Sequence, residues 1–519
     1  MGKTGGRCQR RATPNAAPLV PTGTRRCHDR TEDRPVSDAR ERIAGGRLTR
    51  LGLLDDAALE EVLHLLEEVE SQGVETLRVL FTDQHGVLRG KTLVASAIPA
   101  LFEEGLAAPS TLLLKDTSHR TVFPVWSATG AVAGDMRGAG DILMVPDPAT
   151  FRILPWSPGS AWILCDLAFA SGQEMPFCTR SVLRRSIARL ADRGMKMVAG
   201  LEVEFHVYRV TDPRLDHAGA TMPGQPPQTE NIVQGYQFLT ELRYDAMEDV
   251  MDSLRRTCEG LGLPLRSMEV EMGPSQFEFT FDAGDPMAQA DAMVMLRTAF
   301  KEVCQRKGLH ATFMCRPNLE NAAASGWHLH QSLVLTESGK NLFVPGKKDT
   351  LSETGSAWVA GLLAHAAESC LLTTPTVNGY KRYRPHQLAP DRIFWGRDNR
   401  GAMIRALCAP GKGASRIENR VPEPAANPYL VFASQIIGGL DGIAQGLQAP
   451  PPCEDPYDAS ALPLPDSLLA AIAAFEKSAL YRETLGDTFV DYLCTIRQAE
   501  WDRYHQTVSA WEQQEYFGL

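Results

Sequence analysis

Two histidines lie close together in an otherwise apolar stretch, "ASGWHLHQSL" (residues 324–333). Side chains alternate between the two faces of a strand, so His328 and His330 would share one face. Trp327 and Leu329 would take the other. Taken alone, the pair fits either two hydrogen-bonded histidines or two ligands of a site, because an imidazole serves both purposes. The surrounding sequence has to decide between these interpretations.

Three further stretches repeat the alternating design with charged residues. They are "GLEVEFHVY" (200–208), "SMEVEMGPSQFEFTF" (267–281) and "SRIENRV" (415–421). A single strand of this kind is typical of a sheet face that meets solvent. Several in one region instead indicate polar faces that converge. The residues on these faces are Glu202, Glu204, His206, Tyr208, Glu269, Glu271, Gln276, Glu278, Arg416, Glu418 and Arg420.

Converging glutamates would need cations, because neighbouring carboxylates cannot all stay ionised in a poorly solvated site. An oxygen-rich set with one histidine favours magnesium or manganese over zinc, and two such ions would fit. Nearby arginines would bind phosphate; they are Arg382, Arg400, Arg405, Arg416 and Arg420. The pattern therefore predicts phosphoryl transfer, with His328 as a metal ligand and His330 beside the nucleotide.

Length and composition set the broader frame. A chain of 519 residues is long for a single core, so two domains are expected. The net charge of −10 argues against a nucleic-acid-binding protein, and no apolar run is long enough to span a bilayer. Eleven cysteines without paired spacing favour a reducing cytoplasm. We predict a disordered basic tail over 1–45, a first domain over 46–175 and a second over 176–519.

The first domain is expected to be rich in strands. Leucines at helical spacing predict a helix within 53–73, and two strands around a turn follow within 74–93. Further strands are expected within 141–156 and 160–169, and a helix over 178–195 opens the second domain. The stretch "GVLRGKT" resembles a phosphate-binding loop. It has one residue too few between its glycines and follows a hairpin, so that interpretation is rejected.

Longer stretches resemble the glutamine synthetases and the related γ-glutamyl-amide ligases. The resemblance runs from about residue 74 to the C-terminus, through "GLEVEF", "EMGPSQFEF", "SGWHLHQSL", "NGYKRYRP", "DNRGAMIR" and "RIENRVPEPAANPYLVFASQIIGGLDGI". It implies an α+β fold, with a small N-terminal β-grasp domain and a larger catalytic domain whose curved antiparallel sheet is flanked by helices. It also implies a homo-oligomer, a dodecamer of two hexameric rings, with each active site completed by a neighbour's N-terminal domain.

The resemblance also assigns roles to matching residues, with ATP and Mg²⁺ or Mn²⁺ as cofactors. The ligands of the metal that organises the acid substrate and the amine match Glu204, Glu271 and Glu278. The ligands of the metal beside the nucleotide phosphates match Glu202, His328 and Glu418. Positions on the nucleotide side match His330 and Ser332. Residues that hold glutamate and the transferring phosphate match Arg382 and Arg420. The phosphate-binding arginines match Arg400, Arg405 and Arg416.

The implied reaction joins glutamate to an amine. A carboxylate attacks the γ-phosphate of ATP to give γ-glutamyl phosphate, and the amine then displaces phosphate without a covalent protein nucleophile. Three departures from the family pattern stand near these groups. Ala323-Ala324 replaces the usual Asn-Gly, which leaves the acid substrate less defined than in the family. Trp327 replaces a methionine, and Ser275 replaces a glycine.

Two more departures concern the amine. Ammonia-using members carry a flap glutamate after "YKR" and an aspartate in an "F-D-G-S-S" loop; this sequence has Leu388 and "FPVWSATG" (123–130), with no acid. Ammonium is costly to desolvate without carboxylates, so we predict an alkyl or aryl monoamine. Trp126, Trp327 and Leu388 would contact it, with Ala324 near the substrates. Ammonia, a polyamine, or a non-catalytic protein of the same fold remain the alternatives.

Overall fold

The computed structural model describes residues 2, 36–126, 136–347, 350–384, 389–456 and 460–519. Most of the predicted tail lies outside these residues. The end of that tail was predicted wrongly, because residues 36–44 form helix α1 (Val36–Ala44) and the Ile43 side chain is fully buried. Burial of Ile43 ties this helix to the core of the N-terminal part.

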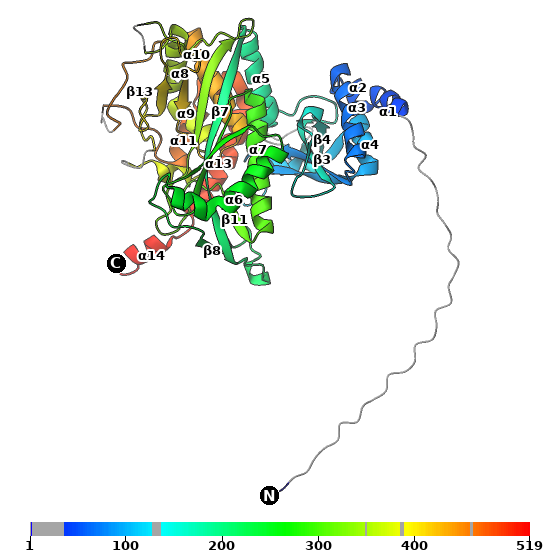
Figure 1. Cartoon of the computed structure of the whole chain (residues 1–519), viewed down its shortest axis with the longest axis horizontal. Coiled ribbons are helices and arrows are strands. Elements are labelled where there is room, and N and C mark those ends of the chain that lie inside the picture. The colour runs from blue at the N-terminus through cyan, green and yellow to red at the C-terminus, as the bar shows by residue number, and fades with distance from the viewer. Residues whose placement is uncertain (1, 3–35, 127–135, 348–349, 385–388, 457–459) are drawn as a thin grey trace.

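The N-terminal part is a small mixed sheet with helices beside it (Figure 1). After α1 its helices and strands are α2 (Arg47–Arg50), α3 (Asp56–Ser71), β1 (Thr76–Thr82), β2 (Leu88–Val94), α4 (Ile98–Glu104), β3 (Leu106–Pro109), β4 (Asp141–Pro146), β5 (Arg152–Ile153) and β6 (Ser160–Ala168). The strand order is β2-β1-β6-β4-β3, with β5 paired to β6. The predicted hairpin is confirmed, and its first strand pairs in parallel with β6, as expected of a β-grasp sheet.

The larger part carries a nine-stranded sheet in the order β13-β14-β15-β12-β7-β10-β9, with β8 and β11 also paired to β7. Its elements are α5 (Thr179–Ala191), β7 (Met195–Asp212), β8 (Gln228–Asn231), α6 (Glu241–Gly260), β9 (Leu265–Val270), β10 (Gln276–Phe281), α7 (Pro286–Arg306), β11 (Leu309–Thr312), β12 (Trp327–Leu335), α8 (Glu353–Ala364), α9 (Ala366–Thr373), β13 (Trp395–Arg397), β14 (Ile404–Leu407), β15 (Arg416–Asn419), α10 (Pro428–Ala444), α11 (Leu468–Glu476), α12 (Ala479–Leu485), α13 (Asp487–His505) and α14 (Ala510–Tyr516). Adjacent strands of this sheet pair antiparallel, except β13 and β14, which pair in parallel. The α+β prediction is confirmed.

The two faces of this sheet follow from the alternation of side chains along its strands. Five apolar residues of these two strands are fully buried: Val203, Phe205 and Val207 of β7, and Phe277 and Phe279 of β10. Phe205 packs against Phe279 and against Phe300 of α7. Trp327 of β12 packs edge-on against Phe432 of α10 on the same side. The alternate residues, which are acids, histidines and arginines, lie together on the opposite face. Residues at alternate positions along these strands therefore form the core on one face of the sheet and the candidate site on the other.

A buried arginine joins the two parts of the chain. Arg180 of α5 is only 4% exposed and pairs with Asp147 (2.7 Å), Asp166 (3.3 Å) and Asp291 (2.9 Å). Asp166 belongs to β6 of the first sheet, while Asp291 belongs to α7 of the second part. A buried guanidinium is stable only with such partners, so removal of any one carboxylate would loosen the junction.

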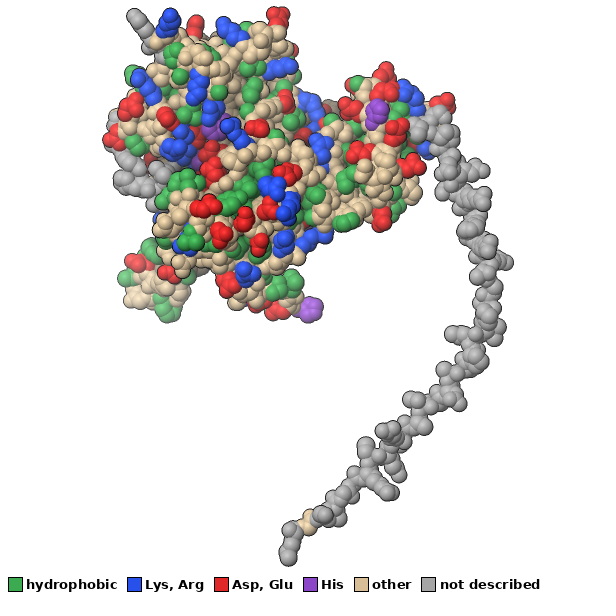
Figure 2. Space-filling view, viewed as in Figure 1, with side chains coloured by type: hydrophobic (Ala, Val, Ile, Leu, Met, Phe, Trp, Pro, Cys, Tyr) green, Lys and Arg blue, Asp and Glu red, His purple; other side chains and the backbone are tan. Residues whose placement is uncertain are grey.

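The surface mixes charges of both signs. Figure 2 shows acidic and basic side chains interspersed over both parts of the visible face, without a large basic stripe. Across the described ranges, no helix has the length and apolar character that a membrane crossing requires.

His365 makes part of the helical layer sensitive to pH. Its Nδ1 lies 2.9 Å from Glu368 and its Nε2 lies 2.8 Å from Asp441 of α10. Burial alone would lower the pKa of His365, but the hydrogen bonds with Glu368 and Asp441 raise it above the usual 6.5. Because the folded pKa exceeds the unfolded one, this stabilisation is complete below about pH 6.5 and is lost as pH rises through the raised pKa.

We therefore expect a His365→Gln variant to lose more thermal stability, relative to the unchanged protein, at about pH 6 than at about pH 9. The measurement is the difference in Tm between the two proteins at each pH. An equal difference at both pH values would show that the charged form of His365 does not contribute.

Candidate active site

Strand pairing brings the predicted ligands side by side on the polar face of the large sheet. His328 of β12 lies opposite Glu202 of β7, and His330 lies opposite Glu418 of β15. Glu278 of β10 lies opposite Glu204 of β7. The carboxyl group of Glu271, just after β9, lies near enough to those of Glu204 and Glu278 to influence their acidity. The six residues predicted as metal ligands thus form one contiguous cluster together with His330.

Distances within the cluster suit cation binding. His328 Nδ1 lies 3.0 Å from Glu202 and 3.9 Å from Glu278, and its Nε2 lies 3.6 Å from Glu204. Candidate ligand atoms of Glu202, Glu278 and His328 lie within 4.8 Å of one another, as do those of Glu202, His330 and Glu418. Glu202 belongs to both sets. The structure thus groups the residues somewhat differently from the two ligand triads that the resemblance implies.

The acidity of these groups tests whether a divalent cation fits. Burial, followed by the charge of Glu271, raises the pKa of Glu204 to about 8. Burial, followed by the charge of Glu204, raises the pKa of Glu278 to about 12. A cation would remove this penalty, and the carboxylate oxygens are donors that Mg²⁺ and Mn²⁺ prefer. The residues present therefore fit such an ion.

At the other end of the cluster, neighbouring side chains keep the carboxylates of Glu202 and Glu418 ionised. Burial would raise the pKa of Glu202, but hydrogen bonds to His328 and His330 keep it below the usual range. Burial would likewise raise the pKa of Glu418, but the Arg420 guanidinium lowers it. Burial, and then Arg420, lowers the pKa of His328 to about 4, so its ring is neutral, as a metal ligand must be.

Four of the five predicted arginines surround this cluster. Arg405 Nη1 donates to Glu418 at 3.1 Å, and Arg420 donates to the other oxygen of the same carboxylate. Arg416 Nε donates to His330 Nδ1 at 3.1 Å. Arg382 is 4% exposed and donates to the carbonyls of residues 420, 421 and 422. Arg400 is instead exposed between β13 and β14, outside the buried cluster.

A cavity of about 640 Å³ opens at the His330 end of the cluster. Its lining includes the predicted nucleotide-side residues His330, Ser332 and Arg416. It also includes two residues that the sequence analysis missed, Arg266 and Asn341. The Asn341 amide donates to the carbonyls of residues 413 and 415 at 2.8 Å and so holds the loop before β15. Asn341 forms an isolated β-bridge with Val334, outside the regular strands, where no periodic signal could mark it.

Comparison with known proteins decides the family. The sequence profile for the catalytic domain of glutamine synthetase matches residues 176–516. The chain belongs to the glutamine synthetase family. It is 40% identical over 497 residues to γ-glutamylanilide synthase of Acinetobacter sp, covering 91% of this chain and 98% of that protein.

Two further relatives of the glutamine synthetase family are similar over most of their length. γ-Glutamylethanolamide synthetase GlnA4 of Streptomyces coelicolor is 33% identical over 87% of this chain and 94% of its own. The solved structure of apo GmaS without ligand superposes with a TM-score of 0.74 at 28% identity, covering 88% of this chain and 99% of that one. The two-part arrangement is therefore shared with a solved structure.

The structure agrees with only some of the predictions about residues that contact the substrates. Trp327 is fully buried against Phe432 on the apolar face, so the prediction that it contacts substrate is wrong. Leu388 and residues 127–130 lie outside the described residues. Trp126 is 78% exposed. The Ala324 carbonyl accepts a hydrogen bond from Gln276, whose amide also donates to Glu204, so Ala324 does lie beside the cluster.

One loop beside Glu271 was not predicted. The backbone N–H of Tyr236 donates to the carbonyl of Met272 at 2.8 Å, and Tyr236 is 69% exposed. Phe238 is also exposed. Ser275, at a family glycine position, has φ of 57°, and its hydroxyl accepts from the N–H of residue 232 at 2.7 Å. Two aromatic side chains are thus displayed next to a predicted ligand of the amine-side metal.

Proposed function

We propose that this protein is an ATP-dependent ligase that joins the γ-carboxylate of glutamate to an organic monoamine through γ-glutamyl phosphate. The observation that carries the proposal is the buried carboxylate and histidine cluster, flanked by arginines and continuous with a cavity of about 640 Å³. Relatives named for anilide and ethanolamide synthesis support the same chemistry. A scaffold without activity would not need to keep the complete cluster.

The reaction has two balanced steps. A glutamate γ-carboxylate oxygen bonds to the γ-phosphorus of ATP as ADP leaves. The amine nitrogen then bonds to the acyl carbon as phosphate leaves, and the nitrogen releases one proton to the departing phosphate or to water. Bound Mg²⁺ or Mn²⁺ would offset the negative charge of the phosphate oxygens. Arg405 and Arg420, which both donate to Glu418, would also donate to the transferring phosphate. Arg382, held by three carbonyls, would fix the acid substrate.

An apolar or aromatic monoamine fits the surroundings better than ammonium does. The exposed aromatic rings of Tyr236 and Phe238 lie on the loop that bonds to Met272, next to Glu271. The sequence supplies no acid at Leu388 or in 123–130. A small hydrated cation would lose its water with little compensation, whereas an apolar body gains contact area.

We expect kcat/KM for aniline or an alkylamine to exceed that for ammonium by about tenfold or more. Steady-state release of phosphate, measured with glutamate, ATP and a panel of ammonium, ethylamine, ethanolamine, aniline and putrescine, checks this. If ammonium gives the highest kcat/KM, the protein is a glutamine synthetase in the strict sense. If putrescine does, the substrate is a polyamine.

The assembly and compartment are also proposals. Family membership supports a dodecamer of two hexameric rings, in which a neighbour's first domain (46–175) would complete the site on the catalytic domain (176–519). Trp126 belongs to the stretch that corresponds to the aspartate-bearing loop of ammonia-using members, and its exposure supports this arrangement. A cytoplasmic location is supported by the cysteines, since all nine that the structure describes are free.

A further inference from the structure

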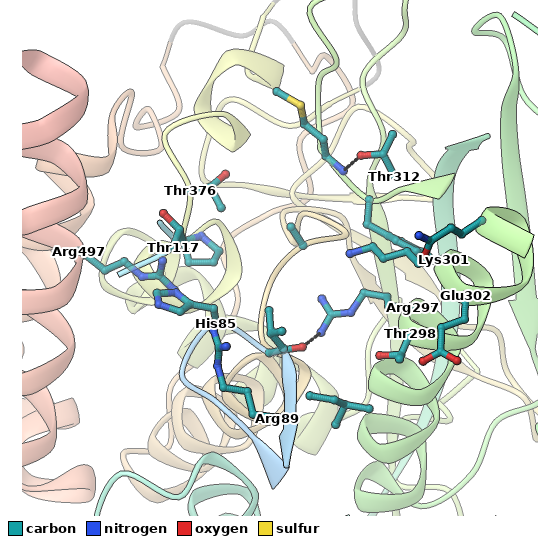
Figure 3. A pocket seen from close by; sticks show the side chains of 18 residues that line it. His85, Arg89, Thr117, Arg297, Thr298, Lys301, Glu302, Thr312, Thr376 and Arg497 are labelled. Atoms are coloured by element: carbon teal, nitrogen blue, oxygen red, sulfur yellow. Dashed lines mark hydrogen bonds between the residues drawn. The ribbon is translucent and has the colours of Figure 1, made fainter. Parts of the chain in front are cut away.

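A second cavity, of about 450 Å³, lies where the β1–β2 turn of the N-terminal part meets α7 and α13. None of the predicted metal ligands lines it. Figure 3 shows Arg297 and Lys301 extending from α7 into this space, with His85 and Arg497 on the opposite wall. The cavity is therefore a feature of the junction between the two parts and is separate from the active site.

Two cations face this space without an ion pair to any described carboxylate. Arg297 donates to the backbone carbonyls of Gly86, Pro424 and Ala426 instead. Lys301 forms no salt bridge with a described carboxylate and lies 5.8 Å from the Phe313 ring centroid. Burial, and then the charge of Arg297, lowers the pKa of Lys301 to about 8, although its side chain still meets solvent. An anion between the two would relieve their repulsion.

A third donor is buried in the opposite wall. Arg497 is 2% exposed, and while its Nη1 pairs with Glu500 at 3.0 Å, its Nε has no hydrogen-bond partner among the described residues. A buried N–H left without an acceptor costs free energy, so it favours a ligand that accepts. Much of the remaining wall is apolar, formed by Val87, Leu88, Phe313, Met314, Pro375 and Ala425.

We propose that this cavity is a regulatory site for a small organic carboxylate with an apolar body. The carboxylate would pair with Lys301 and Arg297 and accept from Arg497. The body would cover the exposed Met314, which an inorganic anion would leave in contact with water. A ring that bears one carboxylate fits a cavity of this size.

The regulatory part of the proposal comes from a segment shared by the two sites. Residues 420–427 are held on the active-site side by Arg382, which bonds to the carbonyls of Val421 and Pro422. Arg297 holds the same segment on the cavity side, through Pro424 and Ala426. A ligand that draws the Arg297 guanidinium toward itself changes one of these two clamps. It would thereby alter glutamate binding near Arg382, a consequence that rests on the proposed function.

Benzoate titrated into the full-length protein tests the site by calorimetry. We expect saturable binding that Lys301→Gln weakens by about tenfold or more, because a charge-assisted bond is lost. The matched control is Lys307→Gln, which removes an exposed lysine at the end of α7 outside the cavity and should leave affinity unchanged. Benzamide, with the same ring and no charge, should bind at least about tenfold more weakly.

Each of the following results would contradict one part of the proposal. Equal affinity of Lys301→Gln and the unchanged protein shows that benzoate binds elsewhere, and absence of binding removes the site. If inorganic phosphate binds as tightly as benzoate, the apolar body of the ligand does not contribute to binding. Benzoate is also expected to change KM for glutamate in the unchanged protein but not in Lys301→Gln. If benzoate binds without changing KM, the cavity is a binding site but has no regulatory role. Binding is measured without turnover, so its failure is distinct from failure of the ligase function.

Discussion

Replacing Glu418 with glutamine is expected to lower kcat by about a hundred- to a thousandfold. The side chain is fully buried between Arg405 and Arg420, and one oxygen lies 3.8 Å from His328. Glutamine keeps the size but removes the charge that balances two guanidinium groups and the proposed cation. The loss falls on the arginines that would hold the transferring phosphate, so chemistry should suffer more than substrate affinity.

Phosphate release with Mg²⁺ or Mn²⁺ measures this effect, and circular dichroism establishes that the variant is folded. Glu248→Gln on the exposed side of α6 is the control for loss of one carboxylate away from the site, and it should keep full activity. If Glu418→Gln retains full turnover, Glu418 is neither a metal ligand nor an organiser of the phosphate arginines. A parallel loss of Mn²⁺ affinity would support the ligand role.

The period of two along the strands explains why most of the cluster could be predicted. Glu202 and Glu204, like His328 and His330, share a face in any regular strand, and the pairing of β7 with β12 then sets them opposite one another. Register is fixed because a slip of one residue would turn Val203 and Phe205 to water and the acids into the core. The same residues thus specify both the core and the site.

Trp327 shows where the rule of alternation should have prevailed. It lies one residue from His328, so alternation alone turns it away from the site, toward Phe432. Its assignment to the substrate came from its place in a family motif, which reports sequence position but not the direction of a side chain. Backbone geometry is the stronger guide for a residue inside a strand.

Features that depend on contacts between residues far apart in the chain have no periodic signal in the sequence. Tyr236 belongs to an irregular loop whose position depends on a bond to Met272, 36 residues later in the chain. The cavity at the domain junction combines residues from the 85–89 turn with Lys301 and Arg497. Burial of Ile43 in α1 likewise required the rest of the first domain. Such contacts follow from the tertiary arrangement of elements, which local patterns do not encode.

Gly326→Ala is expected to lower kcat/KM by about a hundredfold without unfolding the protein. Gly326 comes just before β12, and a methyl group there would lie 2.5 Å from Arg382 Nη2 and 2.9 Å from His328 Nε2. Both distances are shorter than van der Waals contact, so both side chains, or the backbone at residue 326, must move. Arg382 is buried and held by three carbonyls, and His328 is held by Glu202.

A displacement of about 1 Å in either group would misplace the acid substrate or a metal ligand, which is enough for the predicted loss. The backbone at Gly326 does not require a positive φ, so steric contact alone carries the effect. Gly438→Ala in α10 is the matched control, since its methyl group would meet neighbours at 3.7 Å or more and alanine favours a helix. Steady-state kinetics and Tm of both variants check the prediction. If Gly326→Ala keeps the kcat/KM of the unchanged protein, neither Arg382 nor His328 needs its present position for the reaction, and the close approach of the backbone to these two side chains serves packing alone.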